Sequence, residues 1–473
     1  MELSRYKDGF FAIDGTHGFL PVNAPLASLP QRYEQLQTIL DDLPTQKADG
    51  SAGLLASEGL IEERIKLLPD FSVKVSEETD IFVIQALYRA YAFLSSAYTL
   101  APAHFEHKRS GNYGKANRLL PKQLAKPFCI VAQTLKVYPW LDYHYAYSLG
   151  NFVKKDNNLG LNWENLEMAV KFSGLPDERG FIMLHVDINE HSPELLSGVF
   201  STLEVLKDTE SLSSINDDDV FQLLDKCQSA MKKVNERRKV MWKASRWRHY
   251  NDFRVFIMGI KGNEEIFDDG VIYEGVDDTP RQYRGQTGAQ DNVIPTMDIF
   301  SGVINHYPSN ELTHYLMDLR SYRPVCVQRF FEDLRNDVSN LHEEGLVGIL
   351  RDRKFNRSLV SLLGIMEEIY LFRNGHWQFV QKYIMSNTKY AKATGGTPII
   401  SWIPNQIKAV FSAMDNCIQS IASNYGHSEF IRLKLELPAK KELLVNQLEA
   451  LQKPDYQAEH VFSLNKTYKL EDN

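Results

Sequence analysis

The sequence predicts an all-α protein, and three observations lead to that prediction. Apolar residues recur at helical spacing from about residue 79 onward, and stripes of this kind cover 81–91, 220–260, 340–385 and 406–424. Alternating strand patterns are scarce, and no period of roughly 20 to 50 residues repeats. The 473 residues, 43% of them hydrophobic and 11% aromatic, suffice to bury a large core. We therefore expect a large helical globular protein.

Clusters of Gly, Pro, Asn and Asp predict the loops between these helices, at 43–53, 154–161, 261–292 and 386–398. The segment 261–292 is longer than a compact domain normally leaves without structure, so we expect it to be functional or packed on a site. The C-terminal stretch 438–473 is more polar. It predicts one short amphipathic helix around 440–452 in an appendage on the surface.

Charge and cysteine usage restrict the class of partner and compartment. The net charge of -8 and the pI near 5.9 argue against a broad surface for nucleic acid or anionic membrane. The four cysteines lie far apart, which predicts neither a zinc site nor a disulfide framework. The N-terminus lacks signal-peptide features, and no apolar run approaches the about 20 residues that span a bilayer. We expect a cytoplasmic monomer.

One histidine stands in an aromatic helix within 367–384 and is the strongest candidate for a ligand to a group bound in the core. Arg373, three residues before His376, projects from the same side. A flat ligand on His376 would therefore meet a guanidinium at its edge, as a haem with its propionates requires. The alternative is a hydrogen-bonded core histidine. The aromatic and apolar neighbours at helical spacing are Phe372, Phe379, Val380 and Tyr383.

The stretch 371–384, LFRNGHWQFVQKYI, resembles the proximal-histidine helix of the indoleamine 2,3-dioxygenase family. The resemblance implies that His376 binds haem iron and that Arg373 contacts the haem. It further implies that Phe372 and Val380 pack on that haem. The segment 315–324 is similar to another family motif with a structural role, and Val327 stands where the family often carries a histidine, so His376 has no rival there.

The glycine-rich stretch 283–292, followed by 298–302, is similar to a second family signature. Small residues let the backbone approach a planar ligand closely, although a segment of this kind is also common in plain loops. The chain departs from the family at Gln286, Thr287, Asp291 and Asn292, which changes the shape of the distal pocket. The positions that the resemblance places at the cofactor are Thr287, Gly288, Ala289 and Asp298, with Gly288 also touching the substrate.

Arg254 falls where the family has the arginine that binds the substrate carboxylate, and a guanidinium can do so with two parallel hydrogen bonds. The alternative is an ion-paired or surface arginine. His249 and Tyr250 replace two phenylalanines that pack on the indole in the family. Tyr250 can still stack, whereas His249 implies either a more polar indole pocket or a substrate other than plain tryptophan.

On the distal side, 180–186 aligns with a family segment in which serine often stands at the position of His185. The related tryptophan 2,3-dioxygenases use a distal histidine, so we expect His185 to bond the indole nitrogen or bound oxygen and to orient the substrate without acting as a base. A buried histidine satisfied by backbone is the alternative. Phe181, four residues earlier, shares its face.

Two further segments complete the expected site. Residues 143–151 correspond to a family segment in the pocket wall, and we expect His144 and Ser148 to point towards the ligand. Residues 393–397, ATGGT, resemble the end of a mobile lid, which implies that Thr394 contacts the substrate.

These similarities follow the family's order from about residue 18 to about residue 425. They imply a small N-terminal helical domain over 1–172 and a large haem-binding catalytic domain over 173–473, extended from about 430. They further imply haem b, O2 and an external electron donor that keeps the iron ferrous, with L-tryptophan converted to N-formylkynurenine. Two alternatives remain open, namely a haem oxygenase of the same fold acting on another indole and a haem-binding sensor, storage or scaffold protein without turnover.

Overall fold

The computed structural model describes residues 3–207, 214–246, 249–381 and 399–451, and the all-α prediction is confirmed. The strands in this part of the chain form two small sheets. β1 (Leu119–Leu120) pairs in parallel with β4 (Ile272–Tyr273), and β2 (Phe152–Lys154) pairs antiparallel with β3 (Leu166–Met168). Within the described ranges, no helix is both long and apolar enough to cross a bilayer.

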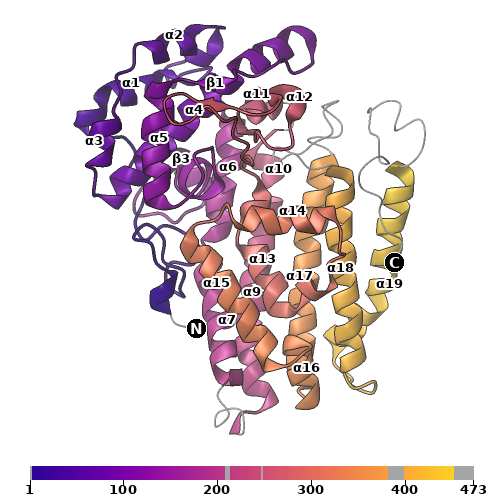
Figure 1. The fold of residues 1–473 in the computed structure, drawn as a ribbon. Coiled ribbons are helices and arrows are strands. Elements are labelled where there is room, and N and C mark those ends of the chain that lie inside the picture. The colour runs from indigo at the N-terminus through magenta and orange to yellow at the C-terminus, as the bar shows by residue number, and fades with distance from the viewer. Residues whose placement is uncertain (1–2, 208–213, 247–248, 382–398, 452–473) are drawn as a thin grey trace.

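The N-terminal helices gather at one end of the molecule, drawn in indigo and purple in Figure 1. The longest of them, α4, is buried along nearly its whole length; Asp80 caps its first turn, and Gly111, with φ of 78°, ends it. This part comprises η1 (Leu3–Tyr6), η2 (Gln31–Tyr33), α1 (Glu34–Asp42), η3 (Leu54–Ala56), α2 (Leu60–Lys66), α3 (Ser72–Ser76), α4 (Ile81–Ser110), α5 (Lys122–Leu135), η4 (Tyr143–Tyr147) and η5 (Trp163–Asn165).

Most of the remaining helices form a bundle in which α17 lies between α9 and α18, whereas the short α11 and α12 lie beside the N-terminal helices (Figure 1). The helices that follow the N-terminal part are α6 (Pro176–Asn189), α7 (Ser192–Lys207), α9 (Asp217–Lys239), α10 (Met241–Ala244), α11 (Asn251–Arg254), η7 (Val255–Ile257), α12 (Glu264–Phe267), η8 (Gly288–Gln290), α13 (Val293–Ser301), η9 (Val303–His306), α14 (Glu311–Arg320), α15 (Val325–Leu341), α16 (Gly345–Asp352), α17 (Asn356–Val380), α18 (Ile399–Ser420) and α19 (Ser428–Leu451).

The helical stripe at 220–260 is not one helix. α9 begins with a capping box between Asn216 and Asp219 and ends at Lys239, after a last turn rich in basic side chains that complement the helix dipole. The chain then turns and continues as the short elements α10, α11 and η7. The short elements also bury apolar side chains at helical spacing, among them Phe253, Phe256 and Ile257, so periodicity alone does not locate such a break.

The predicted C-terminal appendage is wrong as far as residue 451. α19 begins at Ser428, well before the expected 440, and packs against α17 and α18 (Figure 1). Charged side chains on the same helix, including Arg432 and Lys440, bond to the buried Glu367 of α17, and this pairing makes a core-facing helix look polar in sequence. Its buried apolar side chains are Phe430, Leu433, Leu437, Leu444 and Leu448.

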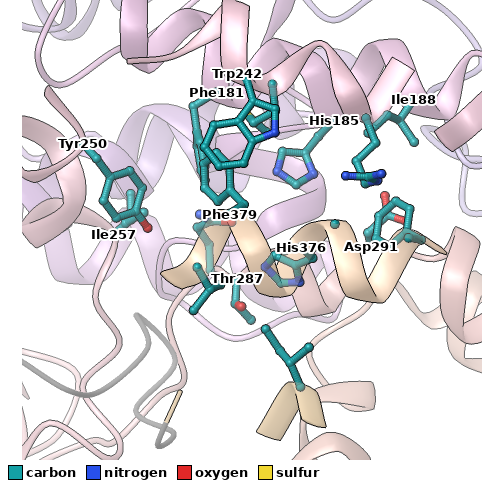
Figure 2. Close-up of a pocket in the computed structure, with 18 of the residues that line it drawn as sticks. Phe181, His185, Ile188, Trp242, Tyr250, Ile257, Thr287, Asp291, His376 and Phe379 are labelled. Carbon is teal, nitrogen blue, oxygen red and sulfur yellow. The ribbon is translucent and has the colours of Figure 1, made fainter. Parts of the chain in front are cut away.

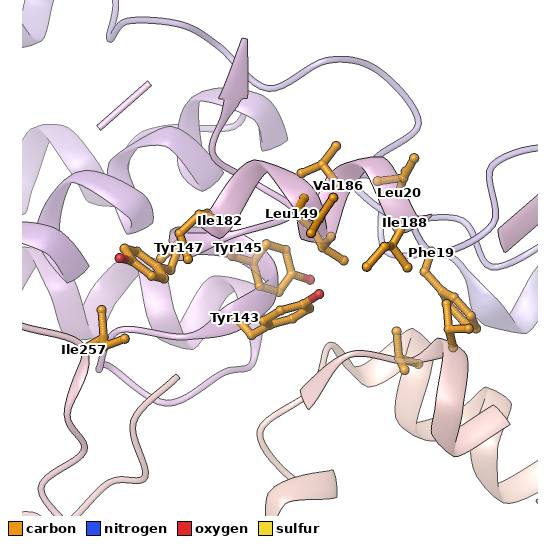
Figure 3. Packing of buried hydrophobic residues seen from close by; sticks show 14 of the residues in the cluster. Phe19, Leu20, Tyr143, Tyr145, Tyr147, Leu149, Ile182, Val186, Ile188 and Ile257 are labelled. Carbon is orange, nitrogen blue, oxygen red and sulfur yellow. The ribbon is translucent and has the colours of Figure 1, made fainter. Parts of the chain in front are cut away.

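A single cluster of buried apolar residues runs from the N-terminal helices to α19. Figure 3 shows part of it, where Tyr143, Tyr145 and Tyr147 of the π-helical turn η4 lie beside Ile182 and Val186 of α6. Asp142 fixes this turn by accepting the backbone N–H groups of 144–146. The packing of η4 on α6 brings the N-terminal part against the bundle, while the domain division at residue 172 stays a prediction.

Candidate active site

A mostly apolar cavity opens between α6, residues 238–242, residues 250–257, the 286–291 turn, α17 and α18. A second cavity adjoins it, and Gly288, Asp291, Phe372, His376 and Trp402 line both. The other walls of the first are Phe181, His185, Ile188, Arg238, Met241, Trp242, Tyr250, Ile257, Gln286, Thr287, Gly375, Phe379, Val380 and Ile403. Apolar cavities with a few polar groups on their walls typically hold small molecules or cofactors.

His376 lies on the wall that the two cavities share, near the C-terminal end of α17 (Figure 2). No described residue hydrogen-bonds to its ring, so the alternative of a hydrogen-bonded core histidine finds no support there. Burial lowers the pKa of His376 to about 4, and the neighbouring His185 and Arg238 lower it in the same direction. The imidazole is therefore neutral at pH 7, which is the form that binds a metal ion.

His185 comes from α6 and lies across the cavity from His376 in Figure 2. Its Nδ1 is 3.3 Å from the hydroxyl oxygen of Tyr143, and burial lowers its pKa. Gly288 faces the ring, since a methyl group placed on this glycine would lie 3.4 Å from Cε1 of His185. The alternative in which backbone groups satisfy the His185 ring is not supported, because among the described residues the ring contacts a tyrosine side chain.

Aromatic side chains form the wall beside the two histidines (Figure 2). Phe181 meets Tyr250 edge to face at 5.3 Å between ring centroids and lies 6.0 Å from Phe379. Trp242 lies 5.6 Å from Phe379 on the same wall. Such a surface suits a flat aromatic ligand.

Arg373 and Asp298 form a buried ion pair in the second cavity. The guanidinium donates to Asp298 at 2.6 Å and to the Tyr307 hydroxyl at 2.7 Å, and it also bonds to Gln406 of α18. Burial alone would lower the pKa of Arg373, but the charge of Asp298 raises it, so the guanidinium stays charged. Ala289 and Arg320 line the same cavity.

A family model described as indoleamine 2,3-dioxygenase matches residues 8–415. The chain belongs to the indoleamine 2,3-dioxygenase family. Indoleamine 2,3-dioxygenase 1 of Rattus norvegicus is 23% identical over 416 residues, which cover 83% of this chain and 92% of the relative. Indoleamine 2,3-dioxygenase 2 of Homo sapiens is 28% identical over 59% of this chain and 64% of its own length. An indoleamine 2,3-dioxygenase of Aspergillus candidus is 24% identical over 82% of this chain and 92% of the relative.

As a member of this family the chain is a dioxygenase, and the family depends on haem. The residues that line the two cavities have the chemistry that a haem requires. A neutral imidazole without a hydrogen-bond partner among the described residues projects from the shared wall, and apolar side chains of α17 flank it. Arg373 is paired with Asp298 in the adjoining cavity, and Arg320 and Arg323 of the same lining add positive charge where the carboxylates of a haem would need it.

The structure brings together many of the residues expected at an indoleamine 2,3-dioxygenase site. Those that line the first cavity are Phe181, His185, Tyr250, Thr287, Gly288, Phe372, His376 and Val380. Ala289, Asp298 and Arg373 line the second. Thr394 and Tyr383 lie outside the described residues.

Other expected residues lie behind the described walls or away from them. His144 is fully buried and contacts Asn292 through Nε2 at 3.3 Å, and Ser148 is buried beside it, so neither points into the described cavity. His249 contacts Asp252 at 3.2 Å with 39% of its side chain exposed, and it therefore adds no polarity to the described wall. Arg254 is fully buried one turn beyond Tyr250, with Nη1 3.3 Å from the Tyr113 hydroxyl.

Sequence reasoning missed several wall residues. Arg238 stands in a basic run at the end of α9, where cations complement the helix dipole, and nothing local shows that its side chain turns into the cavity. Trp402 reaches the cavity from α18, which no family motif covered. Asp291 had been noted only as a departure from the family pattern, and Tyr143 only as part of the pocket-wall segment, yet both bond in the network that holds His185.

Proposed function

We propose that this dioxygenase holds haem b through His376 and inserts both atoms of O2 across the indole C2–C3 bond of L-tryptophan, giving N-formylkynurenine. The observation that carries the proposal is the neutral His376 imidazole, which has no described partner and projects into an apolar cavity opposite a second histidine. When bound and kept ferrous by an external electron donor, haem supplies the oxygen chemistry.

The chain's own residues position the indole and exclude water. Phe181, Tyr250 and Phe379 offer aromatic faces and edges between which an indole ring can pack. Holding the ring in one orientation next to the reacting partner converts a bimolecular encounter into a reaction within one complex. The mostly apolar walls keep bulk water from competing for the site.

Arg254 is the proposed partner of the substrate carboxylate. It lies in the same helical segment as Tyr250, whose side chain lines the cavity, and its charge is buried. In this proposal the guanidinium exchanges its contact with the neutral Tyr113 hydroxyl for a carboxylate, which accepts two parallel hydrogen bonds and is the stronger partner. An Arg254→Lys variant keeps the charge but loses the fork, so KM for tryptophan should rise.

Polar groups in the first cavity support a second candidate, an indole other than tryptophan. Gln286, Thr287 and Asp291 reach the walls from the glycine-rich segment, at positions where the chain departs from the family. Such groups favour a substrate with an additional hydrogen-bonding substituent. Comparing turnover of L-tryptophan with that of ring-hydroxylated tryptophans separates the two candidates.

Haem reconstitution tests the proposal. The wild-type protein should give a Soret band and, with ascorbate, methylene blue, O2 and L-tryptophan, should form N-formylkynurenine. His376→Ala should lose the Soret band, whereas His17→Ala, which changes a histidine bonded to Asp14 in the N-terminal segment, should keep it. A Soret band that survives His376→Ala would refute the ligand assignment. A band that depends on His376, with no product from any indole, would favour a non-catalytic haem protein.

A further inference from the structure

Three buried side chains form a continuous chain of hydrogen bonds behind the distal wall. The Tyr143 hydroxyl lies 2.8 Å from Oδ2 of Asp291 and 3.3 Å from Nδ1 of His185. Tyr143 belongs to η4, His185 to α6, and Asp291 to the turn after η8, so three separate segments meet here. Asp291 and His185 both line the first cavity and are labelled in Figure 2.

The partners of Asp291 show that its side chain acts as an acceptor. Nδ2 of Asn189 donates to Oδ2 at 2.7 Å, and the backbone N–H of Val293 donates to Oδ1 at 2.9 Å. The same Asn189 nitrogen also donates to the carbonyl oxygen of His185 at 2.8 Å, which fixes the orientation of that amide. With two N–H donors already directed at it, the carboxylate takes the tyrosine proton as its third hydrogen bond.

Proton counting then determines the state of His185. A tyrosine hydroxyl carries one proton, and in this arrangement Tyr143 donates it to Asp291. The tyrosine oxygen therefore offers only a lone pair to His185. Nδ1 of His185 must carry the ring proton to complete that bond, and a neutral imidazole then has an unprotonated Nε2.

We propose that Asp291 and Tyr143 are positioning residues that hold His185 in the Nδ1–H tautomer, so that Nε2 accepts a hydrogen bond from the indole N–H of the substrate. Burial lowers the pKa of His185 and keeps the ring neutral, which this arrangement requires. Within the described chain nothing bonds to Nε2, and the ring lies on the cavity wall. This inference rests on the proposed function and refines it, because it makes a free indole N–H a requirement for binding.

The tautomer also distinguishes between the two partners that the sequence left open for His185, the indole nitrogen and bound oxygen. In the Nδ1–H form the only ring proton points at Tyr143, so His185 has none to donate to an acceptor in the cavity. It can accept from an N–H group and cannot donate to an oxygen. A 1-methylated indole would meet the Nε2 lone pair with a methyl group, leaving that nitrogen without a partner, which costs roughly 10- to 100-fold in binding.

The tautomer is measured first, on haem-free protein labelled with 15N-histidine. The His185 signals are assigned by their loss in His185→Phe, and the 15N shifts distinguish Nδ1–H from Nε2–H. Wild type should show Nδ1–H. Tyr143→Phe and Asp291→Asn should both show Nε2–H, since the first removes the acceptor and the second lets the amide donate to Tyr143 and reverse the hydroxyl. Tyr145→Phe is the matched control, because it removes a buried hydroxyl that bonds to Asp8 instead.

The selectivity is measured second, as the ratio of the Kd values of L-tryptophan and 1-methyl-L-tryptophan in the haem-loaded protein. Wild type and Tyr145→Phe should prefer tryptophan, and Tyr143→Phe and Asp291→Asn should reduce this preference roughly 10-fold or more. An Nε2–H signal in wild type, or a preference unchanged in both variants, would overturn the proposal. Failure of the wild type to bind haem would overturn the proposed function instead, and the tautomer measurement would still support or refute the hydrogen-bond chain.

Discussion

Removing the carboxylate of Asp298 should strongly destabilise the protein, because it breaks a buried ion pair at the second cavity. The side chains of Asp298 and Arg373 are 3% and 6% exposed, and they join α13 to α17 through a bond of 2.6 Å. Asp298→Ala leaves the Arg373 guanidinium buried with only neutral partners, Tyr307 and Gln406. Breaking a buried pair from one side typically costs about 3 to 5 kcal/mol, because the remaining charge is no longer compensated.

The matched variants separate charge from packing. Tyr307→Phe removes a neutral hydroxyl that donates to Asp298 at 2.6 Å, and its loss should cost about 1 kcal/mol. Asp298→Ala combined with Arg373→Met removes both charges, so the double variant should be less destabilised than the sum of the two single variants by about 2 kcal/mol. If Asp298 and Arg373 did not interact, the effects of the two single changes would simply add.

Urea unfolding of the haem-free protein, followed by tryptophan fluorescence and far-UV circular dichroism, measures these differences. The urea concentration at the unfolding midpoint should be highest for wild type, lower for Tyr307→Phe and lowest for Asp298→Ala, and the slopes of the three transitions should be similar. A loss below about 1 kcal/mol for Asp298→Ala, or strictly additive single changes, would refute the argument that a buried charge pair holds α13 to α17.

Two further perturbations follow from the packing. Gly180→Ala should cost about 1 to 3 kcal/mol, because its methyl group would collide with the carbonyl oxygen of Ala244, whereas Gly426→Ala points into open space and should change the urea midpoint little. Glu367→Gln should cost about 1 to 3 kcal/mol at pH 7, since it weakens the attachment of α19. Burial raises the pKa of Glu367, but Arg432 and Lys440 together lower it by more, so the pKa lies below the usual value. The stabilisation from the Glu367 carboxylate is thus present above about pH 4.3 and lost as the pH falls through the lowered pKa. The urea midpoints of wild type and Glu367→Gln should therefore converge on acidification. A constant difference down to pH 3 would contradict the pairing of Glu367 with α19.

Local spacing predicted the helical class and the side chains around the proposed ligand His376, and the family resemblance predicted its role. Side chains three and four residues apart share a helix face whatever the rest of the chain does, so Phe372, His376 and Val380 could be placed together from the sequence, and the structure has them on one cavity wall. The family resemblance could likewise be recognised from the sequence, because each motif is short and the motifs follow the family's order along the chain. The same local reasoning failed at α19, where the partners of its charged residues lie on α17, which is distant in sequence.

The tertiary structure decided which polar residues face the cavity. His144 was expected to point inward, yet it contacts Asn292, a residue 148 positions away. The resemblance assigned the segments of Tyr143, His185 and Asp291 to the pocket, but it did not predict that their side chains bond to one another. Only the packing of η4, α6 and the turn after η8 brings them within hydrogen-bonding distance. The sequence by itself determined the fold class and the family and singled out His376 as the proposed ligand, because these depend on local periodicity and motif order. The orientation of the distal side chains depends on contacts between segments far apart in the chain, and only the folded structure supplies those contacts.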